Sequence, residues 1–343
     1  MKYSSRGYSL LSQTLSVFIF YLFLAGCSGG KSENVKNQDS TKNQKLEGVK
    51  ADGSFDKADY DRRMLALANG DTTGKWPHVT AYPLPGAVFP YHRVVAYYGN
   101  LYSKRMGVLG EYPKDTMFKM LLAECEKWKN ADTALPVRPA LHYIAVTAQS
   151  NGGKQRMRMP FHQIDTILNW AKEINALVFI DVQVGWSTIQ EELPELEKYL
   201  QMPNVHFGMD PEFSMKGGEV PGKKIGTFDA ADINFAIDYL AGLVKKYNIP
   251  PKVLIVHRFT QGMVTNAMSI KTVPEVQTVM DMDGWGDKIL KRSTWLRYIY
   301  KEPVQFTGFK LFYKNDIKKG KDQLYTADEL SKFIPKPIYI QYQ

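Results

Sequence analysis

Two carboxylates, Asp210 and Glu212, stand on either side of Pro211, directly after a compact and mostly apolar stretch, residues 205–209. That stretch predicts a buried strand. Residues two apart in a strand point to the same face, and proline, which has no N–H to donate, is expected to end the pairing. The segment therefore predicts a strand whose carboxyl end presents two acids on one side. Glu212 is the candidate general acid, and Asp210 would orient it or stabilise charge.

Polar side chains also stand at the carboxyl ends of other apolar stretches of the chain. The candidate catalytic residues are Asp181, Asp210, Glu212, Asp281 and Asp283. The candidate substrate-binding residues are Tyr97, Tyr98, Gln183, His257, Arg258, Trp285, Lys310 and Gln341. Carboxylates crowded into a cleft raise one another's pKa, which leaves a protonated acid beside an ionised one, as a glycosidase needs. The alternative is that ion pairs with Lys310 and Arg258 only hold the rim of the fold together.

A divalent metal ion is a rival use of the acidic residues. The side chains concerned are those of Asp181, Asp210, Glu212, His257, Asp281 and Asp283. Their oxygens and nitrogen are ligands that such an ion accepts. The sequence contains neither an HxH nor an HExxH spacing, so we expect no metal and no cofactor. His142 and His206 lie inside predicted strands, where we expect structural histidines.

Eight apolar segments would position these side chains. The predicted strands cover residues 94–99, 138–147, 176–183, 205–212, 252–259, 276–283, 305–312 and 337–342. The predicted helices cover residues 56–69, 115–129, 160–174, 188–200, 230–247, 288–300 and 327–333, with a weak one near Thr265. Near-continuous apolar strands indicate burial on both faces and a parallel sheet. Eight such βα units in about 250 residues predict an α/β protein with a (β/α)8 TIM barrel, in which functional groups gather at the carboxyl ends of the strands.

An open doubly wound sheet is the alternative architecture. Such a sheet normally carries a glycine-rich phosphate turn after its first strand. Here Gly99 is followed by Asn100 and Leu101, and no GxGxxG pattern appears there. The closed barrel is therefore the favoured prediction. No helix is predicted after the eighth strand, and residues 54–91 would cover that gap or the bottom of the barrel.

The N-terminal segment has the pattern of an export signal. Lys2 and Arg6 precede a largely apolar run, residues 10–24, and Ala25-Gly26 leads from that run to Cys27. The sequence Leu-Ala-Gly-Cys resembles the bacterial lipobox, and the resemblance implies cleavage before Cys27 and lipidation of its thiol and new amino group. The alternative, an uncleaved membrane anchor, needs a longer apolar run. We therefore expect an exported protein, anchored through lipid at Cys27 to the membrane of the bacterial cell envelope.

Composition divides the chain into four parts. We expect a lipoprotein signal peptide at 1–26, a lipidated, disordered linker at 27–53, an N-terminal helix and irregular wrap at 54–93, and a single barrel domain at 94–343. The linker has few apolar side chains and cannot offset the entropy of folding. Removing Lys2 and Arg6 lowers the formal net charge from +9 to +7. We attribute this charge to solvated surface near an anionic membrane or wall, and expect a monomer without a nucleic-acid partner.

From residue 94 to residue 343 the chain resembles a family of bacterial secreted lipoproteins with a glycoside hydrolase-like TIM-barrel domain. The segments that carry the resemblance are Val95–Gly99, Asp181–Gln183, Asp210–Glu212, Ile225–Asp232, Val256–Arg258 and Gly308–Lys310. The resemblance implies the fold and the export. Asp210 and Glu212 also resemble the Asp-x-Glu of chitinase-like glycosidases at the fourth strand. The Asp-Gly-x-Asp run of those enzymes is absent, and Lys310 stands where retaining barrel glycosidases place a carboxylate.

The leading hypothesis is a cell-surface, glycoside hydrolase-like enzyme that uses the carboxylates at the barrel mouth on a cell-wall or environmental polysaccharide. Two alternatives use the same groups. The first is a non-catalytic carbohydrate-binding lipoprotein, and the second is a metal-dependent hydrolase. Aromatic side chains such as Tyr98 and Trp285 would stack on sugar rings in the enzyme and in the binding protein alike.

Overall fold

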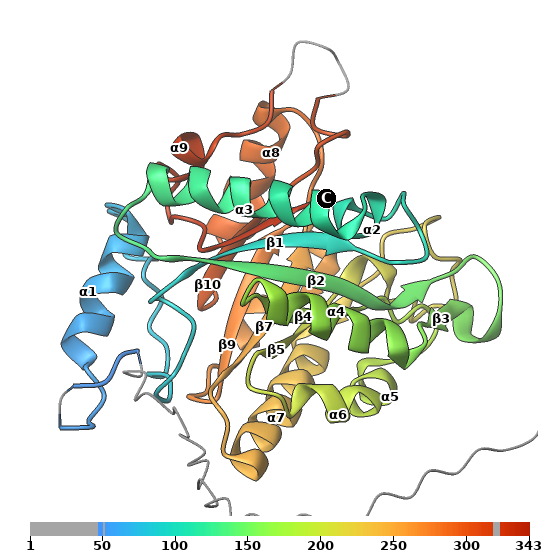
Figure 1. The fold of residues 1–343 in the computed structure, drawn as a ribbon, viewed down its shortest axis with the longest axis horizontal. Helices are drawn as coiled ribbons and strands as arrows, with labels where there is room; N and C mark the ends of the chain where they lie inside the picture. Colours follow the sequence, from blue (N-terminus) through green and yellow to red (C-terminus); the bar gives the residue numbers. More distant parts are fainter. Residues whose placement is uncertain (1–46, 51, 318–322) are drawn as a thin grey trace, which may run out of the picture. The chain divides into compact units, whose positions relative to one another are not determined.

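The computed structural model describes residues 47–50, 52–317 and 323–343 (Figure 1). The predicted signal peptide 1–26, Cys27 and most of the predicted linker 27–53 lie outside the described residues. The described end of the linker already belongs to the folded domain, because Val49 pairs with Phe55 in a β-bridge. Among the described helices, none combines the length and the apolar character that crossing a membrane requires.

Eight parallel strands close into a barrel, which confirms the predicted fold. They are β1 (Arg93–Gly99), β2 (Val137–Ala148), β4 (Leu177–Val182), β5 (Val205–Met209), β7 (Lys252–Arg258), β9 (Val276–Met282), β10 (Phe306–Leu311) and β11 (Tyr339–Tyr342). The first strand pairs with β2 on one side and with the last strand, β11, on the other, so the sheet returns to its start. A short strand, β3 (Arg156–Arg158), is antiparallel to the end of β2.

Helices follow most strands on the outside of the barrel, as α3 and α4 do beside β2 (Figure 1). The helices are α1 (Lys57–Ala68), α2 (Val108–Glu111), α3 (Lys114–Ala131), α4 (Phe161–Glu173), α5 (Ile189–Glu192), α6 (Glu197–Leu200), α7 (Ala230–Tyr247), α8 (Lys288–Thr294) and α9 (Ala327–Leu330). A π-helical turn, Trp295–Tyr300, extends α8. The longest helices lie where the sequence predicts them.

Two predicted helices differ in the structure. The single helix predicted over 188–200 is divided into α5, a 3-10 turn at Pro194–Leu196, and α6, because Pro194 has no N–H for the helical ladder. The prediction of a helix near Thr265 was wrong. That segment forms a two-residue strand, β8 (Val264–Thr265), which pairs with β6 (Phe228–Asp229).

The end of the barrel where the strands begin is closed by apolar side chains. Inward-facing residues such as Phe179 and Phe306 pack there against α1 and residues 87–91. Phe89 is fully buried, and its backbone N–H and C=O bond to the side-chain amide of Gln277 at 3.0 and 2.6 Å. The segment that precedes β1 therefore covers the bottom of the barrel, and only the opposite end, the mouth, is left for a site.

Candidate active site at the mouth of the barrel

Above the apolar floor, the inward-facing side chains become polar. We call this set the buried polar layer, and it consists of Tyr98, His142, Asp181, His257, Asp281 and Gln341. Each of them is at most 2% exposed. The pleat of each strand explains their direction, because side chains two residues apart share a face. Asp181 stands two residues after the inward-facing Phe179, so it points into the barrel too.

Two glycines make room for this layer. A Cβ atom on Gly208 of β5 would lie 2.6 Å from Asp181 Oδ1 and 2.6 Å from His142 Nε2. A Cβ atom on Gly308 of β10 would overlap Asp281 Oδ1. Carboxylates from the adjacent strands β4 and β9, and an imidazole from β2, thus occupy the space that side chains at 208 and 308 would fill. The layer depends on the absence of those two side chains.

The buried polar layer is held by hydrogen bonds and ion pairs. Tyr98 donates its hydroxyl hydrogen to Asp181 Oδ2 at 2.9 Å. His257 Nδ1 lies 3.2 Å from Asp281 Oδ2 and 3.4 Å from Asp283 Oδ2. On the far side, His142 Nδ1 shares a hydrogen bond with the Tyr339 hydroxyl at 2.5 Å. Each imidazole is therefore fixed through its Nδ1 atom, and its Nε2 atom faces the middle of the layer.

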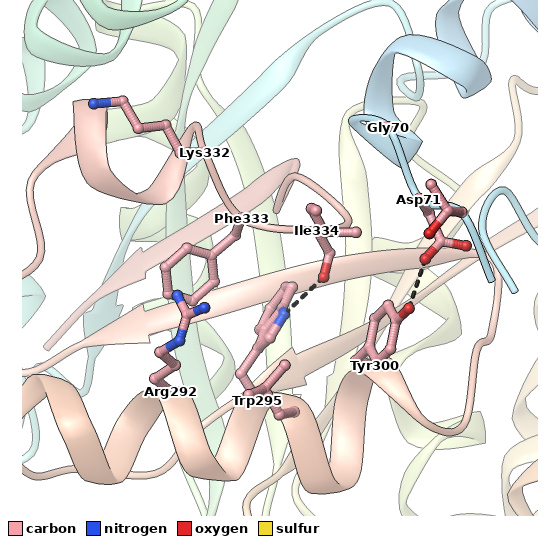
Figure 2. Close-up of a pocket in the computed structure, with 10 residues that line it drawn as sticks. Gly70, Asp71, Arg292, Trp295, Tyr300, Lys332, Phe333 and Ile334 are labelled. Carbon is pink, nitrogen blue, oxygen red and sulfur yellow. Dashed lines mark hydrogen bonds between the residues drawn. The ribbon is translucent and has the colours of Figure 1, made fainter.

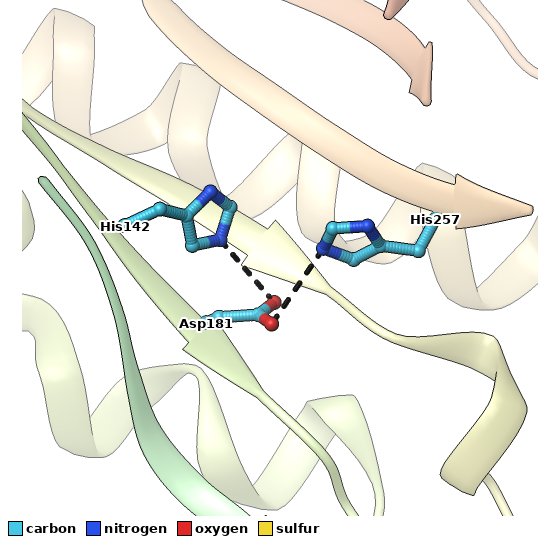
Figure 3. Close-up of side chains that lie close together, drawn as sticks. All are labelled: His142, Asp181 and His257. Atoms are coloured by element: carbon cyan, nitrogen blue, oxygen red, sulfur yellow. Dashed lines mark ion pairs between the residues drawn. The ribbon is translucent and has the colours of Figure 1, made fainter. Parts of the chain in front are cut away.

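Figure 3 shows the two imidazoles on either side of the Asp181 carboxylate. The Nε2 atom of His142 lies 3.7 Å from Asp181 Oδ1, and that of His257 lies 3.6 Å from Asp181 Oδ2. These separations are longer than a hydrogen bond. The three residues therefore face one another across a space in the barrel interior.

A cavity of about 630 Å³ opens above this layer at the carboxyl ends of the strands. Its polar lining includes Tyr98, Arg105, Gln183, Asp210, Glu212, Asp283, Lys310, Asn315 and Gln343, and its aromatic lining includes Phe213, Phe259, Trp285 and Phe312. Cavities of this size and mixed lining are typical of small-molecule and substrate sites. The strand ends were predicted to meet at one mouth, and in the structure they line one cavity that has carboxyl and aromatic side chains in its walls.

The chain turn after β5 positions the two acids on which the sequence argument began. Asp210 caps the 3-10 helix Pro211–Phe213, and its Oδ1 accepts the backbone N–H of Glu212 at 3.1 Å. Gln183 donates from Nε2 to Asp210 Oδ2 at 3.4 Å. With both of its oxygens engaged, Asp210 fixes the turn that carries Glu212 into the cavity wall.

On the opposite wall of the cavity, Lys310 contacts both Asp283 and Tyr98. Its Nζ lies 2.9 Å from Asp283 Oδ1 and 3.9 Å from the centre of the Tyr98 ring. Because His257 contacts the other oxygen of Asp283, this carboxylate has a basic partner on each side. In the cavity, Asp283 therefore forms ion pairs with two basic side chains. Among the described residues, no basic side chain lies as close to Asp210 or Glu212, which follow β5.

Burial and neighbouring charges shift the pKa values of Glu212, Asp210 and His257. Burial, followed by repulsion from Asp283, raises the pKa of Glu212 to about 7. Burial is also the main reason that the pKa of Asp210 lies well above its usual range, and Glu212 adds to it. For His257, burial opposes the charged form, but Asp181 and the other carboxylates outweigh it and raise the pKa well above the usual value. Burial thus favours the neutral forms of Asp210 and Glu212, whereas the surrounding carboxylates favour the charged form of His257 in the absence of other partners.

The pKa values of His142, Asp181 and Asp281 are also shifted, in directions set by burial and by their neighbours. Burial lowers the pKa of His142 to about 4, although Asp181 opposes this. Burial acts to raise the pKa of Asp181, but His257 and His142 overcome it and hold the pKa well below the usual value. For Asp281, burial exceeds the effect of His257 and raises the pKa.

The structure brings most of the predicted site residues together, at two depths. The cavity is lined by Tyr98, Gln183, Asp210, Glu212, Asp283, Trp285 and Lys310. Asp181, His257, Asp281 and Gln341 lie below it in the buried polar layer. Gln341 bonds through Nε2 to His142 Nδ1 and to the Tyr339 hydroxyl, both at 3.0 Å, so its contacts are with the layer.

Tyr97 and Arg258 require correction, because they face away from the cavity. The Tyr97 hydroxyl bonds to that of Tyr313 at 2.9 Å, between the strands and the outer helices. Arg258 is fully buried, pairs with Glu302 at 2.6 Å, and donates to four backbone carbonyls. Each stands next to an inward-facing residue, Tyr98 or His257, and adjacent residues of a strand point to opposite faces.

Some residues of the site were not among the sequence candidates. His142 was expected to be structural, yet it faces Asp181 in the buried polar layer. Arg105 and Phe259 also line the cavity. The strand pattern held a signal for His142, because it follows the inward-facing Ala140 by two residues. Arg105 lies on the loop after β1, and no strand pattern marks its direction.

A second cavity of about 290 Å³ lies away from the strand ends (Figure 2). It is bounded by residues 70–72, the π-helical turn after α8, and residues 332–334. Its carboxylate, Asp71, accepts the Tyr300 hydroxyl at 2.6 Å, and Trp295 Nε1 donates to the Ile334 carbonyl at 3.2 Å. These groups hold segments of the fold together, so the mouth cavity is the better candidate site.

No known protein family matches the chain, and no curated protein matches it either. Among solved structures, the chain is similar to the catalytic module of a family 98 glycoside hydrolase from Streptococcus pneumoniae TIGR4. The two share 11% identity with a TM-score of 0.35 over 74% of this chain and 47% of that one. The chain therefore spans about half the length of that module.

Two mannanases are similar to the same degree. Bacillus subtilis mannanase man26 shares 11% identity with a TM-score of 0.34, over 74% of this chain and 79% of the mannanase. A ruminal GH26 endo-beta-1,4-mannanase shares 11% identity with a TM-score of 0.34, over 75% of this chain and 60% of its own. Each likeness is one of fold alone, and the strand pairing above establishes that fold by itself.

Proposed function

We propose that the protein is a glycoside hydrolase that cleaves a glycan in the mouth cavity, with Glu212 as the proton donor. One observation supports this proposal above the others. Glu212 and Asp283 line the same cavity: burial raises the pKa of Glu212 to about 7, whereas Asp283 is paired with Lys310 and His257. Hydrolysis of a glycosidic bond uses one protonated carboxyl group and one ionised carboxylate.

The roles follow from the surroundings of each group. Glu212 transfers its proton to the glycosidic oxygen as the bond to the anomeric carbon breaks. Asp283 faces the positive charge that develops at that carbon. A water molecule then adds to the carbon and returns a proton to the site, so that the protein ends in its starting state. Asp210 is a positioning residue, because it binds the backbone N–H of Glu212.

The rest of the cavity suits a sugar ring. Trp285 is 56% exposed at the mouth, and Phe213 and Phe259 also line the cavity. Sugar rings present apolar C–H faces that pack on such aromatic surfaces, while Gln343 offers an amide group for hydroxyls. The lipobox-like segment before Cys27 supports a location at the cell envelope, so the proposed substrate is a cell-wall or environmental polysaccharide.

A glycan panel with detection of reducing ends tests this function. We expect one glycan class to be cleaved by the purified chain, and Glu212→Gln to lower kcat by at least about 100-fold, since general acids contribute 10²–10⁴-fold. Binding of that glycan should persist. Glu126→Gln, at an exposed position on α3, is the matched control and should keep full activity. Unchanged kcat in Glu212→Gln would remove Glu212 from the mechanism, and binding without cleavage would favour a carbohydrate-binding protein.

A further inference from the structure

We propose that His142, Asp181 and His257 bind a divalent transition-metal ion, such as Zn²⁺, within the barrel beneath the mouth cavity. The three side chains come from β2, β4 and β7 and are fully buried. One candidate ligand atom from each lies within 4.8 Å of the others. The proposal is independent of glycan hydrolysis, because it rests on the geometry of the buried polar layer alone.

The atoms that face this space lack other partners. Within the described part of the chain, His142 Nε2, His257 Nε2 and Asp181 Oδ1 make no hydrogen bond. A buried polar atom without a partner has lost its hydrogen bonds to water and gained none in return, which destabilises the folded state. Three such atoms turned toward one space (Figure 3) are therefore unfavourable unless something polar or charged joins them.

The spacing suits a metal ion better than direct hydrogen bonds. The two nitrogens lie 3.7 and 3.6 Å from the nearest Asp181 oxygens. Zinc bonds of about 2.1 Å at tetrahedral angles place neighbouring ligand atoms about 3.4 Å apart. The three ligand atoms lie within 4.8 Å of one another, so side-chain rotations that shorten the widest separation by up to about 1.4 Å would give that arrangement. Two imidazoles and one carboxylate are also a ligand set that zinc and iron sites use.

Each imidazole has the outer partner that a metal ligand needs. His257 Nδ1 contacts the carboxylates of Asp281 and Asp283 at 3.2 and 3.4 Å, and His142 Nδ1 contacts the Tyr339 hydroxyl at 2.5 Å. A hydrogen bond donated by Nδ1 fixes the ring and leaves the Nε2 lone pair for the metal. At His142 this requires the Gln341 amide, whose Nε2 lies 3.0 Å from Nδ1, to turn its oxygen toward the ring, and that oxygen has no hydrogen-bond partner among the described residues in its present orientation. Through His257, the ion would also steady Asp283, which lines the cavity above.

Gly208 marks the place that the ion would occupy. A Cβ atom at this position would lie 2.6 Å from both Asp181 Oδ1 and His142 Nε2. An alanine would therefore push these two ligands apart or fill the space between them. Gly242, on α7, provides a matched control, because a Cβ atom there meets nothing within 4 Å.

Metal titration of the full chain, purified in detergent and treated with EDTA, tests the proposal. We expect one equivalent of Zn²⁺ per chain, with a micromolar or tighter Kd by calorimetry, and one equivalent of Co²⁺ with visible absorption from nitrogen and oxygen ligands. His142→Gln should weaken Zn²⁺ binding by more than about 100-fold, whereas His162→Gln, at an exposed position, should not change it. Gly208→Ala should weaken binding relative to Gly242→Ala.

Two results would overturn the proposal. The first is wild-type protein that binds no Zn²⁺ or Co²⁺ above the level of a detergent blank, which would assign the space to water or to a proton on an imidazole. The second is equal Zn²⁺ affinity in His142→Gln and His162→Gln. A melting curve for each variant separates lost binding from lost folding, and the Co²⁺ spectrum of the wild type tests the ligand set without any substitution.

Discussion

Replacing Glu212 by glutamine is expected to change how the stability of the protein depends on pH, even without a substrate. In the folded protein the pKa of Glu212 is raised from 4.5 to about 7, chiefly by burial and then by Asp283. The folded state therefore holds the Glu212 proton more tightly than the unfolded chain does. By linkage, this favours folding below pH 4.5, and the contribution is lost as the pH rises toward 7.

The size of the effect follows from the shift. A difference of about 2.5 pKa units corresponds to about 3 kcal/mol at 1.36 kcal/mol per unit. The side chain is partly exposed, so we expect about 2–3 kcal/mol of unfolding free energy to be lost between pH 4.5 and pH 8 through Glu212. Glu212 also helps to raise the pKa of Asp210, so its removal reduces the contribution of Asp210 with the same sign.

Urea unfolding at pH 4.5, 6 and 8 measures this prediction. Wild-type and Glu212→Gln proteins are compared at each pH, so that titration of all other groups largely cancels. We expect the variant to gain about 2–3 kcal/mol relative to the wild type as the pH rises from 4.5 to 8. Glu126→Gln, which lacks the buried surroundings, should gain much less. If the difference between wild type and Glu212→Gln is the same at all three pH values, the raised pKa, and with it the proposed proton donor, is refuted.

Two further substitutions test the fold that carries the site. Arg258→Met should lower the unfolding free energy by about 3 kcal/mol or more in urea titrations, because Glu302 and the backbone carbonyls bound by the buried guanidinium lose their partner; a loss below 1 kcal/mol would contradict this. Gln277→Leu leaves the buried N–H and C=O of Phe89 unpaired and should cost about 2–4 kcal/mol, measured in the same way, and an unchanged midpoint would show that residues 87–91 do not close the barrel.

The architecture could be predicted because each barrel strand is a nearly continuous apolar run. Both faces of these strands are buried, so hydrophobicity marks all eight of them, and long helices such as α7 have clear ends. The segments whose secondary structure was predicted wrongly are short or are interrupted by a proline. Pro194 divides a helix that otherwise has a suitable pattern, and the residues around Thr265 are too few to show a period.

The candidate site was predicted in part, because strand ends could be located more reliably than side-chain directions. Asp210, Glu212 and Asp283 were identified as residues at the mouth, and the structure places all three in one cavity. Tyr97 and Arg258 were included although each is adjacent to an inward-facing residue. His142 was left out because it lies deep in β2, and depth depends on the stagger between strands, which one strand's sequence does not encode.

The glycines at 208 and 308 have a consequence for the evolution of this chain. Each one accommodates an atom from a neighbouring strand, the Asp181 oxygen at 208 and the Asp281 oxygen at 308. The identities at 181 and 208 are therefore coupled, and so are those at 281 and 308. In diverging homologues these positions should covary: a larger residue should replace Gly308 only where residue 281 has become smaller, and Gly208 only where residues 142 and 181 both leave room for it.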